Sequence, residues 1–142
     1  MIAARPAHAY VPGRTPRHPE GAFDAIRSSV RPGMDAAALA RSAAFRTGLR
    51  YLDDAYHWEA HELLEPVWMA LPEGKDRRFV QGLIQLANGL LKLRMGRPKA
   101  AARLAGIAEA LLGGQEERVM GVDRREMLER CALLRRNAKY AL

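Results

Sequence analysis

Residues 75–95 read KDRRFVQGLIQLANGLLKLRM, and this stretch decides the fold. Its apolar side chains recur at helical spacing and cover well over half of the helix circumference, which is typical of a helix buried on most sides. One polar strip remains, and it carries Arg77, Arg78, Gln81, Gln85, Asn88 and Lys92. The stretch therefore predicts a central helix with neighbours on most of its surface and one line of polar contacts.

The preceding stretch, residues 55–71, predicts a second helix, with Asp53 or Asp54 as its N-cap. Its apolar side chains form an ordinary core face on a wheel at about 100° per residue. Pro66 lies within this helix and leaves the carbonyl of Glu62 without its helical donor, which predicts a kink. Large rings beside charges favour a site in which the charges have partners. The polar face gathers Trp58, His61, Glu62, Glu65 and Trp68.

Residues 72–74 predict the turn that joins these two helices. In an antiparallel pair folded about this turn, position 62 faces position 85 and position 65 faces positions 81–82. We therefore expect Glu62 beside Gln85, and Glu65 beside Gln81 or Arg78. If these pairs are buried and structural, Glu62→Ala or Arg78→Ala should cost about 3–5 kcal/mol.

Residues typical of helix N-termini predict three more helices in addition to this pair. They begin at Asp35, at Pro98 and at Asp123, and the first of them runs to about residue 52. Alanine supplies 25 residues whereas Val, Ile and Thr together supply 12, which favours helices over strands. We predict an all-α fold, a compact bundle of about five helices that forms a single domain over residues 34–142.

Residues 1–33 differ from the rest of the chain because they hold five prolines and three glycines. Proline fixes φ and lacks an amide donor, so no long helix fits this stretch. We predict a Pro/Arg-rich N-terminal arm, with one short turn around residues 23–29. A disordered tail and an arm packed on the domain or on a partner subunit are both left open.

The formal charge of +7 is uneven: +5 over residues 1–50, −2 over 51–95 and +4 over 96–142. A basic protein can neutralise nucleic-acid phosphates, but here the cations lie at the two ends of the chain. No zinc-finger spacing, glycine-rich KH loop or RNP-like aromatic box is present. We therefore do not expect a nucleic-acid partner. Interaction with nucleic acid or protein through the basic termini is kept as an alternative function.

Neither a membrane span nor a disulfide is expected. The longest uncharged apolar stretch, residues 79–91, has 13 residues, whereas a span needs about 20. The single Cys131 has no partner within the chain and fits a reducing compartment. A cytoplasmic location is the resulting expectation.

The two central helices resemble a family of bacterial and archaeal proteins called domain of unknown function 309. The resemblance covers roughly residues 48–112 and rests on an "AHE…LE…W" helix followed by an "R-x-x-x-Q-G-L-I-Q" helix. It implies a small all-helical fold in a bacterial protein and no established activity. Pro66 departs from the family, which more often has an acidic or polar residue there. The positions that it singles out are His61, Glu62, Glu65, Trp68, Arg78, Gln81, Gly82 and Gln85.

Several functions are compatible with these residues, and whether the protein is an enzyme is left open. We expect either a structural polar network or a pocket for a small polar or cationic ligand. As an alternative, the outline H-E-x-x-E would let His61 and Glu65 ligate a divalent metal, with Glu62 as a general base for hydrolysis. A third ligand is missing from this outline, so no cofactor is expected. His61 and Glu62 are the candidate catalytic residues. A homodimer seam over Trp68 or over Gly82 and Gly89 is also left open.

Overall fold

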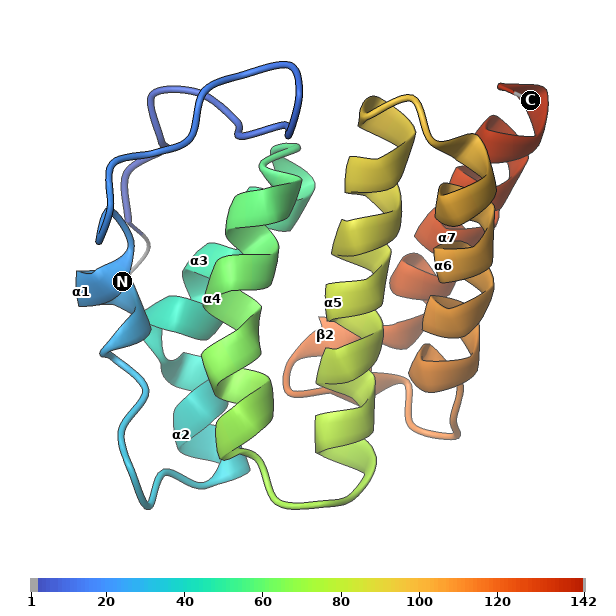
Figure 1. Cartoon of the computed structure of the whole chain (residues 1–142). Helices are drawn as coiled ribbons and strands as arrows, with labels where there is room; N and C mark the ends of the chain where they lie inside the picture. The colour runs from blue at the N-terminus through green and yellow to red at the C-terminus, as the bar shows by residue number, and fades with distance from the viewer. Residues whose placement is uncertain (1–2, 142) are drawn as a thin grey trace.

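The computed structural model describes residues 3–141, and it consists mainly of helices (Figure 1). The central helix α5 packs against α4 on one side and α6 on the other, and α7 packs against α6 (Figure 1). The predicted all-α bundle around residues 75–95 is confirmed. No helix among the described residues is both long and apolar enough to cross a membrane. In chain order the elements are α1 (Asp24–Arg27), α2 (Ala36–Arg41), α3 (Ala43–Asp53), α4 (His57–Ala70), α5 (Lys75–Arg94), α6 (Pro98–Leu112), β1 (Arg118–Val119), β2 (Val122–Asp123) and α7 (Arg124–Tyr140).

The single helix predicted from residue 35 to about 52 is wrong, because the chain divides at Ser42. Asp35 does cap the start, since its side chain accepts a hydrogen bond from the N–H of Ala38 at 2.8 Å. Ser42 then has an extended backbone with ψ 150°, and its hydroxyl oxygen accepts from the N–H of Phe45 at 3.1 Å. Serine at this position therefore caps a new helix and separates α2 from α3.

The start of α4 also differs from the prediction. Asp53 is the last residue of α3 and Asp54 follows it as the C-cap, so neither aspartate caps α4. Ala55, with φ 67°, turns the chain before α4 begins at His57. The Asp54 carboxylate accepts hydrogen bonds from Arg50 at 3.0 Å and from Arg5 at 3.1 Å. The bond from Arg50 is the main reason why the pKa of Asp54 is lowered.

Two glycines of α5 allow its neighbours to come close. A methyl group at Gly82 would lie 2.7 Å from Cγ of Leu112 in α6, and one at Gly89 would lie 2.7 Å from Cδ2 of Leu134 in α7. The face that carries both glycines is therefore covered within the chain, and it is not free to form a homodimer seam.

We expect Gly82→Ala to lower the free energy of unfolding by about 1–3 kcal/mol, because the added methyl group would overpack the contact between α5 and α6. Gly113→Ala is the matched control, since its φ is −65° and its new methyl group would lie 3.5 Å from the nearest atom. Urea denaturation followed by circular dichroism measures both changes. Equal, small changes in the two variants would show that α5 and α6 are not in such close contact.

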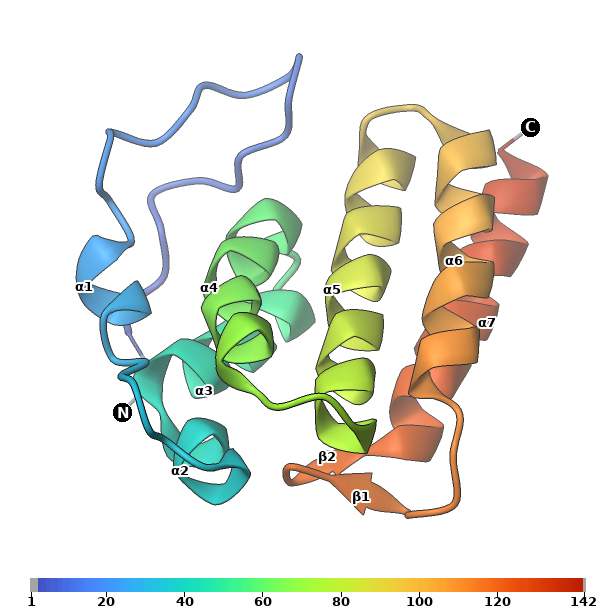
Figure 2. The same cartoon turned by 60° about the horizontal axis from the view of Figure 1, so that its bottom comes forward.

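The last helix begins as predicted, because the Asp123 side chain accepts from the N–H of Glu126 at 3.2 Å. A small antiparallel hairpin precedes it, with Arg118 opposite Asp123, below the ends of α5 and α7 in Figure 2. Its turn residues, Met120 and Gly121, have φ angles of 52° and 80°. The hairpin was not expected, because strands of two residues are too short to show an alternating pattern.

The N-terminal arm packs on α3 and α4, on the side of the bundle away from α6 and α7 (Figures 1 and 2). The N–H of Ala3 donates to the hydroxyl oxygen of Thr47 at 3.1 Å, and the Tyr51 hydroxyl donates to the carbonyl of Ala4 at 2.7 Å. Helix α1 coincides with the short turn expected around residues 23–29. Of the two alternatives left open for residues 3–33, the structure shows the packed arm.

Candidate functional site

A chain of hydrogen bonds centred on His61 connects α4 with α5. Nδ1 of His61 bonds to Oδ1 of Asn88 at 2.7 Å, and Nε2 bonds to Oε2 of Glu65 at 3.0 Å. The amide nitrogen of Asn88 donates to Oε1 of Gln85 at 3.4 Å. Four of the residues singled out from the sequence therefore lie together, all half-buried. Both ring nitrogens of His61 are used within this network, which ties the two helices to one another.

Other singled-out residues lie elsewhere, so the expected pair of Glu62 with Gln85 is wrong, and Arg78 is not the partner of Glu65. Glu62 pairs with Arg27 of the arm, 3.5 Å away, and not with Gln85. Arg78 is exposed and donates to the carbonyl of Ala110 in α6 at 2.8 Å, and not to Glu65. Successive helical residues differ by about 100°, so Glu62 faces the arm when His61 faces α5. The expected cost of about 3–5 kcal/mol for Glu62→Ala or Arg78→Ala loses its basis, because these side chains are not buried.

The remaining singled-out residues take different positions. Trp68 is half-buried, and the Arg77 guanidinium lies 4.5 Å over its ring and donates to its carbonyl at 3.1 Å. That arginine occupies the ring face that a cationic ligand would need. Gln81 is half-buried in α5, one position before Gly82. Trp58, like Glu62, meets the arm.

The arm supplies the hydrogen-bond donor that Pro66 lacks. Pro66 has no N–H, so the carbonyl of Glu62 lacks its usual donor within α4. A guanidinium nitrogen of Arg27 donates to this carbonyl instead. The same nitrogen lies 3.5 Å from the Glu62 carboxylate, so one arginine satisfies both groups. Helix α4 thus continues past the proline with help from a residue outside it.

The most buried acidic residue, Glu59, was not among the predicted site residues. Its exposed fraction is 0%, and its Oε2 accepts from the N–H of Tyr10 at 2.7 Å and bonds to Nε2 of His18 at 2.5 Å. Its other oxygen, Oε1, has no partner within the described residues. The available signal was that Glu59 precedes Leu63 by one turn, on the apolar face of α4. Its partners could not be found, since arm residues follow no helical period.

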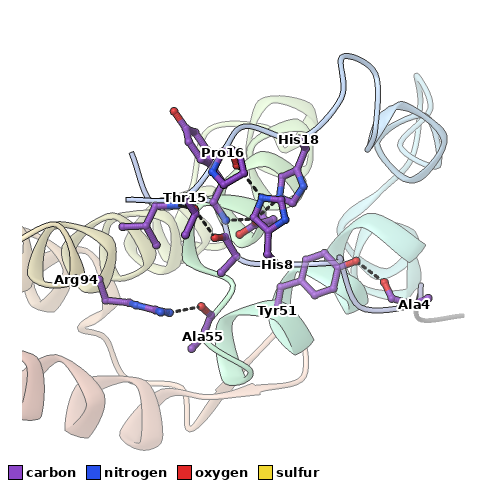
Figure 3. Close-up of polar contacts among 12 residues, drawn as sticks. Ala4, His8, Thr15, Pro16, His18, Tyr51, Ala55 and Arg94 are labelled. Carbon is purple, nitrogen blue, oxygen red and sulfur yellow. Dashed lines mark hydrogen bonds and ion pairs between the residues drawn. The ribbon is translucent and has the colours of Figure 1, made fainter. Parts of the chain in front are cut away.

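Aromatic rings lie around His18, the histidine that is bonded to this carboxylate. The ring of Trp58 lies 5.2 Å from that of Tyr10 and 6.2 Å from that of Phe23. His18 lies 6.0 Å from Trp58 and stacks on His8 at 4.7 Å. His8 is fixed in turn by a bond of 2.7 Å to the carbonyl of Pro16, drawn in Figure 3. The arm is therefore held on α4 by one buried acid and a ring cluster.

A cavity of about 530 Å³ opens beside this cluster, between the arm and α4. Rings of Trp58 and Phe23 line it together with the exposed carboxylates of Glu20 and Asp24. Two arginines also line it, but Arg27 is engaged with Glu62, and the Arg17 guanidinium lies 5.7 Å over the ring of Tyr10. The cavity therefore combines apolar walls with acidic groups that are open to solvent.

A second buried polar residue, His57, lies at the start of α4. Its Nδ1 is buried and has no partner within the described residues. Burial, together with the smaller effect of the charges of Arg94 and Arg130, lowers the pKa of His57 to about 4. Arg94 is held nearby by a bond of 3.0 Å to the carbonyl of Ala55 (Figure 3). His57 is thus a neutral side chain at ordinary pH.

The donors expected for a metal are only partly assembled. His61 and Glu65 do lie side by side, but they are hydrogen-bonded to one another. Across residues 3–141, no group of three or more His, Cys, Asp or Glu side chains is placed to share one ion. Glu62, the proposed general base, is turned toward Arg27. The described residues do not complete an H-E-x-x-E centre.

Comparison with known proteins shows that the central helices are similar to one family. Residues 45–104 match the family model described as Domain of unknown function (DUF309). Neither the curated proteins nor the solved structures gave a match. The match covers α4 and α5 with their flanking segments, whereas the arm lies outside it. The resemblance found from the sequence is therefore confirmed over residues 45–104, which are similar to this family.

Proposed function

We propose that the protein binds a small polar ligand with a cationic group in the cavity between the arm and α4. One observation carries the proposal: rings of Trp58 and Phe23 and the solvent-open carboxylates of Glu20 and Asp24 line the same space of about 530 Å³. That volume lies within the range of small-molecule sites, roughly 300–1,000 Å³. A bound cation would be attracted both by the faces of the aromatic rings and by the carboxylates.

Cationic ligands are favoured over anionic ones, because the arginines that line the cavity already have partners and the carboxylates that line it are exposed. The guanidinium of Arg27 is already engaged by Glu62, and that of Arg17 lies over Tyr10. Glu20 and Asp24 are exposed. An anion would compete with existing contacts, whereas a cation would find carboxylates open to it.

Thermal-shift and calorimetric titrations with choline, putrescine and arginine test this proposal, with glutamate as the anionic control. We expect at least one cationic probe to raise the melting temperature, and Glu20→Gln/Asp24→Asn to weaken its binding at least about tenfold. The matched control is Glu117→Gln/Glu129→Gln, which removes two exposed carboxylates elsewhere. Failure of every cationic probe, or equal weakening in both double variants, would overturn the proposal.

The polar network around His61 is proposed to be structural. This rests on the use of both ring nitrogens by Asn88 and Glu65, which leaves neither free for a metal or a substrate. Elemental mass spectrometry of protein purified without chelators tests the metal alternative. About one equivalent of metal, lost in His61→Ala, would contradict the structural role.

We also propose a bacterial, cytoplasmic setting. The only cysteine of the chain, Cys131, is buried in α7. Burial raises the pKa of its thiol to about 11, so the thiol stays protonated. Such a cysteine acts as a small apolar side chain and needs no oxidising compartment.

A further inference from the structure

One end of the bundle is formed by two segments that contain Lys and Arg side chains but no Asp or Glu. Residues 92–108 hold five Lys or Arg side chains and residues 130–141 hold four, and neither segment contains Asp or Glu. These segments are the end of α5, the first turns of α6 and the second half of α7. The corner between α5 and α6 lies at the same end of the molecule as the C-terminus (Figure 1). The fold therefore brings together two basic segments that 21 residues separate in the sequence.

Most of these cations are not neutralised. Three are engaged: Arg130 pairs with Asp53, Arg135 with Glu109, and Arg94 donates to a carbonyl. The other six form no ion pair with any residue in the 3–141 range. The six are Lys92, Arg97, Lys99, Arg103, Arg136 and Lys139. Lys92 is half-buried, and the other five are exposed.

The register of α6 and α7 brings the cations of the two helices together. The helices are antiparallel neighbours, and the Arg135–Glu109 pair lies across their contact. Toward the basic end, Lys139 follows Arg135 by four residues in α7, and Arg103 precedes Glu109 by six residues in α6. Lys99 follows on the same face of α6, since it precedes Arg103 by four residues.

The arm adds a further cation to this end. A methyl group at Gly96 would lie 3.1 Å from the Arg14 guanidinium, so this arginine packs against the corner between α5 and α6. Asp53 is paired with Arg130, and Asp54 is paired with Arg5 and Arg50, so these two acids are already engaged. The expectation against a nucleic-acid partner relied on cations lying at the two ends of the chain, and the contact of Arg14 brings one cation of the N-terminal end to this C-terminal patch.

An aromatic side chain completes the surface. Tyr140 is 81% exposed and follows Lys139 at the end of α7. A ring among unpaired cations suits a nucleic-acid strand, because bases stack on aromatic rings while the cations neutralise phosphates. A helix that inserts into a membrane needs a broader apolar face. We propose that this end of the bundle, defined by Arg14, Arg97, Lys99, Arg103, Lys139 and Tyr140, binds a single-stranded nucleic acid.

Fluorescence anisotropy with an end-labelled oligouridylate of about 16 nucleotides tests the proposal on the full chain. We expect binding at low salt and a dissociation constant that rises steeply with salt concentration. The triple variant Lys99→Glu/Arg103→Glu/Lys139→Glu should weaken binding more than about tenfold and reduce the log–log salt slope by about 2. Tyr140→Ala should weaken binding about fivefold or more while leaving the slope unchanged.

The matched control is Arg31→Glu/Arg41→Glu/Arg46→Glu, which changes the charge equally at exposed positions before α4. It should alter the affinity less than about threefold, and melting curves establish that both triple variants are folded. No binding at low salt, or equal weakening by the two triple variants, would overturn the proposal. So would binding to phosphatidylserine vesicles that is tighter than binding to the oligonucleotide.

Discussion

Glu59→Ala should lower the free energy of unfolding by about 3–5 kcal/mol, which is the loss expected when one member of a buried pair is removed. The Glu59 carboxylate is 0% exposed. It accepts a hydrogen bond from the N–H of Tyr10 and is bonded to Nε2 of His18. Alanine would leave both groups without their acceptor and would open a cavity at a fully buried position. Urea denaturation of the full chain, followed by circular dichroism, measures the loss.

Glu62→Ala is the matched control for this substitution. It removes a carboxylate one turn further along α4, but its side chain is about one-third exposed and its pair with Arg27 is long. We expect a loss below about 1 kcal/mol. Glu59→Gln, which keeps one oxygen for both donors, should give an intermediate loss. If Glu59→Ala were no more destabilising than Glu62→Ala, the arm would not be anchored by this residue.

Stability should fall by about 3 kcal/mol between neutral pH and pH 4 on account of His57 alone. Its pKa is about 4 in the folded chain, whereas an unfolded histidine titrates near 6.5. The unfolded state therefore binds a proton at a higher pH than the folded state does. The stabilisation is complete above about pH 6.5 and is lost as the pH falls toward 4.

A comparison of wild type with His57→Gln isolates this contribution, because glutamine does not titrate. We expect the wild type to lose its stability more steeply than the variant between pH 7 and pH 4, as measured by urea denaturation at each pH. The other histidines and the carboxylates are common to both proteins, so they cancel in the difference. A difference between the two proteins that stayed constant with pH would show that His57 is not buried as a neutral ring.

The helices could be predicted from the sequence because their determinants are local. Hydrophobic periodicity gave α5, and the side chains of Asp35 and Asp123 capped the helices that they were expected to cap. Ser42 was the exception, because it lies within an alanine-rich stretch that reads as one continuous helix. Its role as an N-cap follows only from the extended backbone that it adopts in the structure. Local signals thus decide where helices occur more reliably than where they are interrupted.

The candidate site was less predictable because its contacts are not local. The wheel placed His61 toward α5 correctly, but it could not supply an arm residue as the partner of Glu62. His18 and Tyr10 belong to a proline-rich stretch with no period, and they reach Glu59 across about 40–50 residues of chain. The sequence therefore indicated which face of α4 is unusual, while the structure was needed to show that part of this face is covered from within the chain.

The bond from Arg27 to the carbonyl of Glu62 has a consequence for the order of folding. A helix ordinarily grows by adding one local hydrogen bond per residue. At Pro66 that growth lacks one bond, and the missing donor comes from a side chain 35 residues earlier. Helix α4 therefore reaches its full set of hydrogen bonds only when the arm has docked, so the arm is part of the cooperative folding unit and is not added after the bundle has formed.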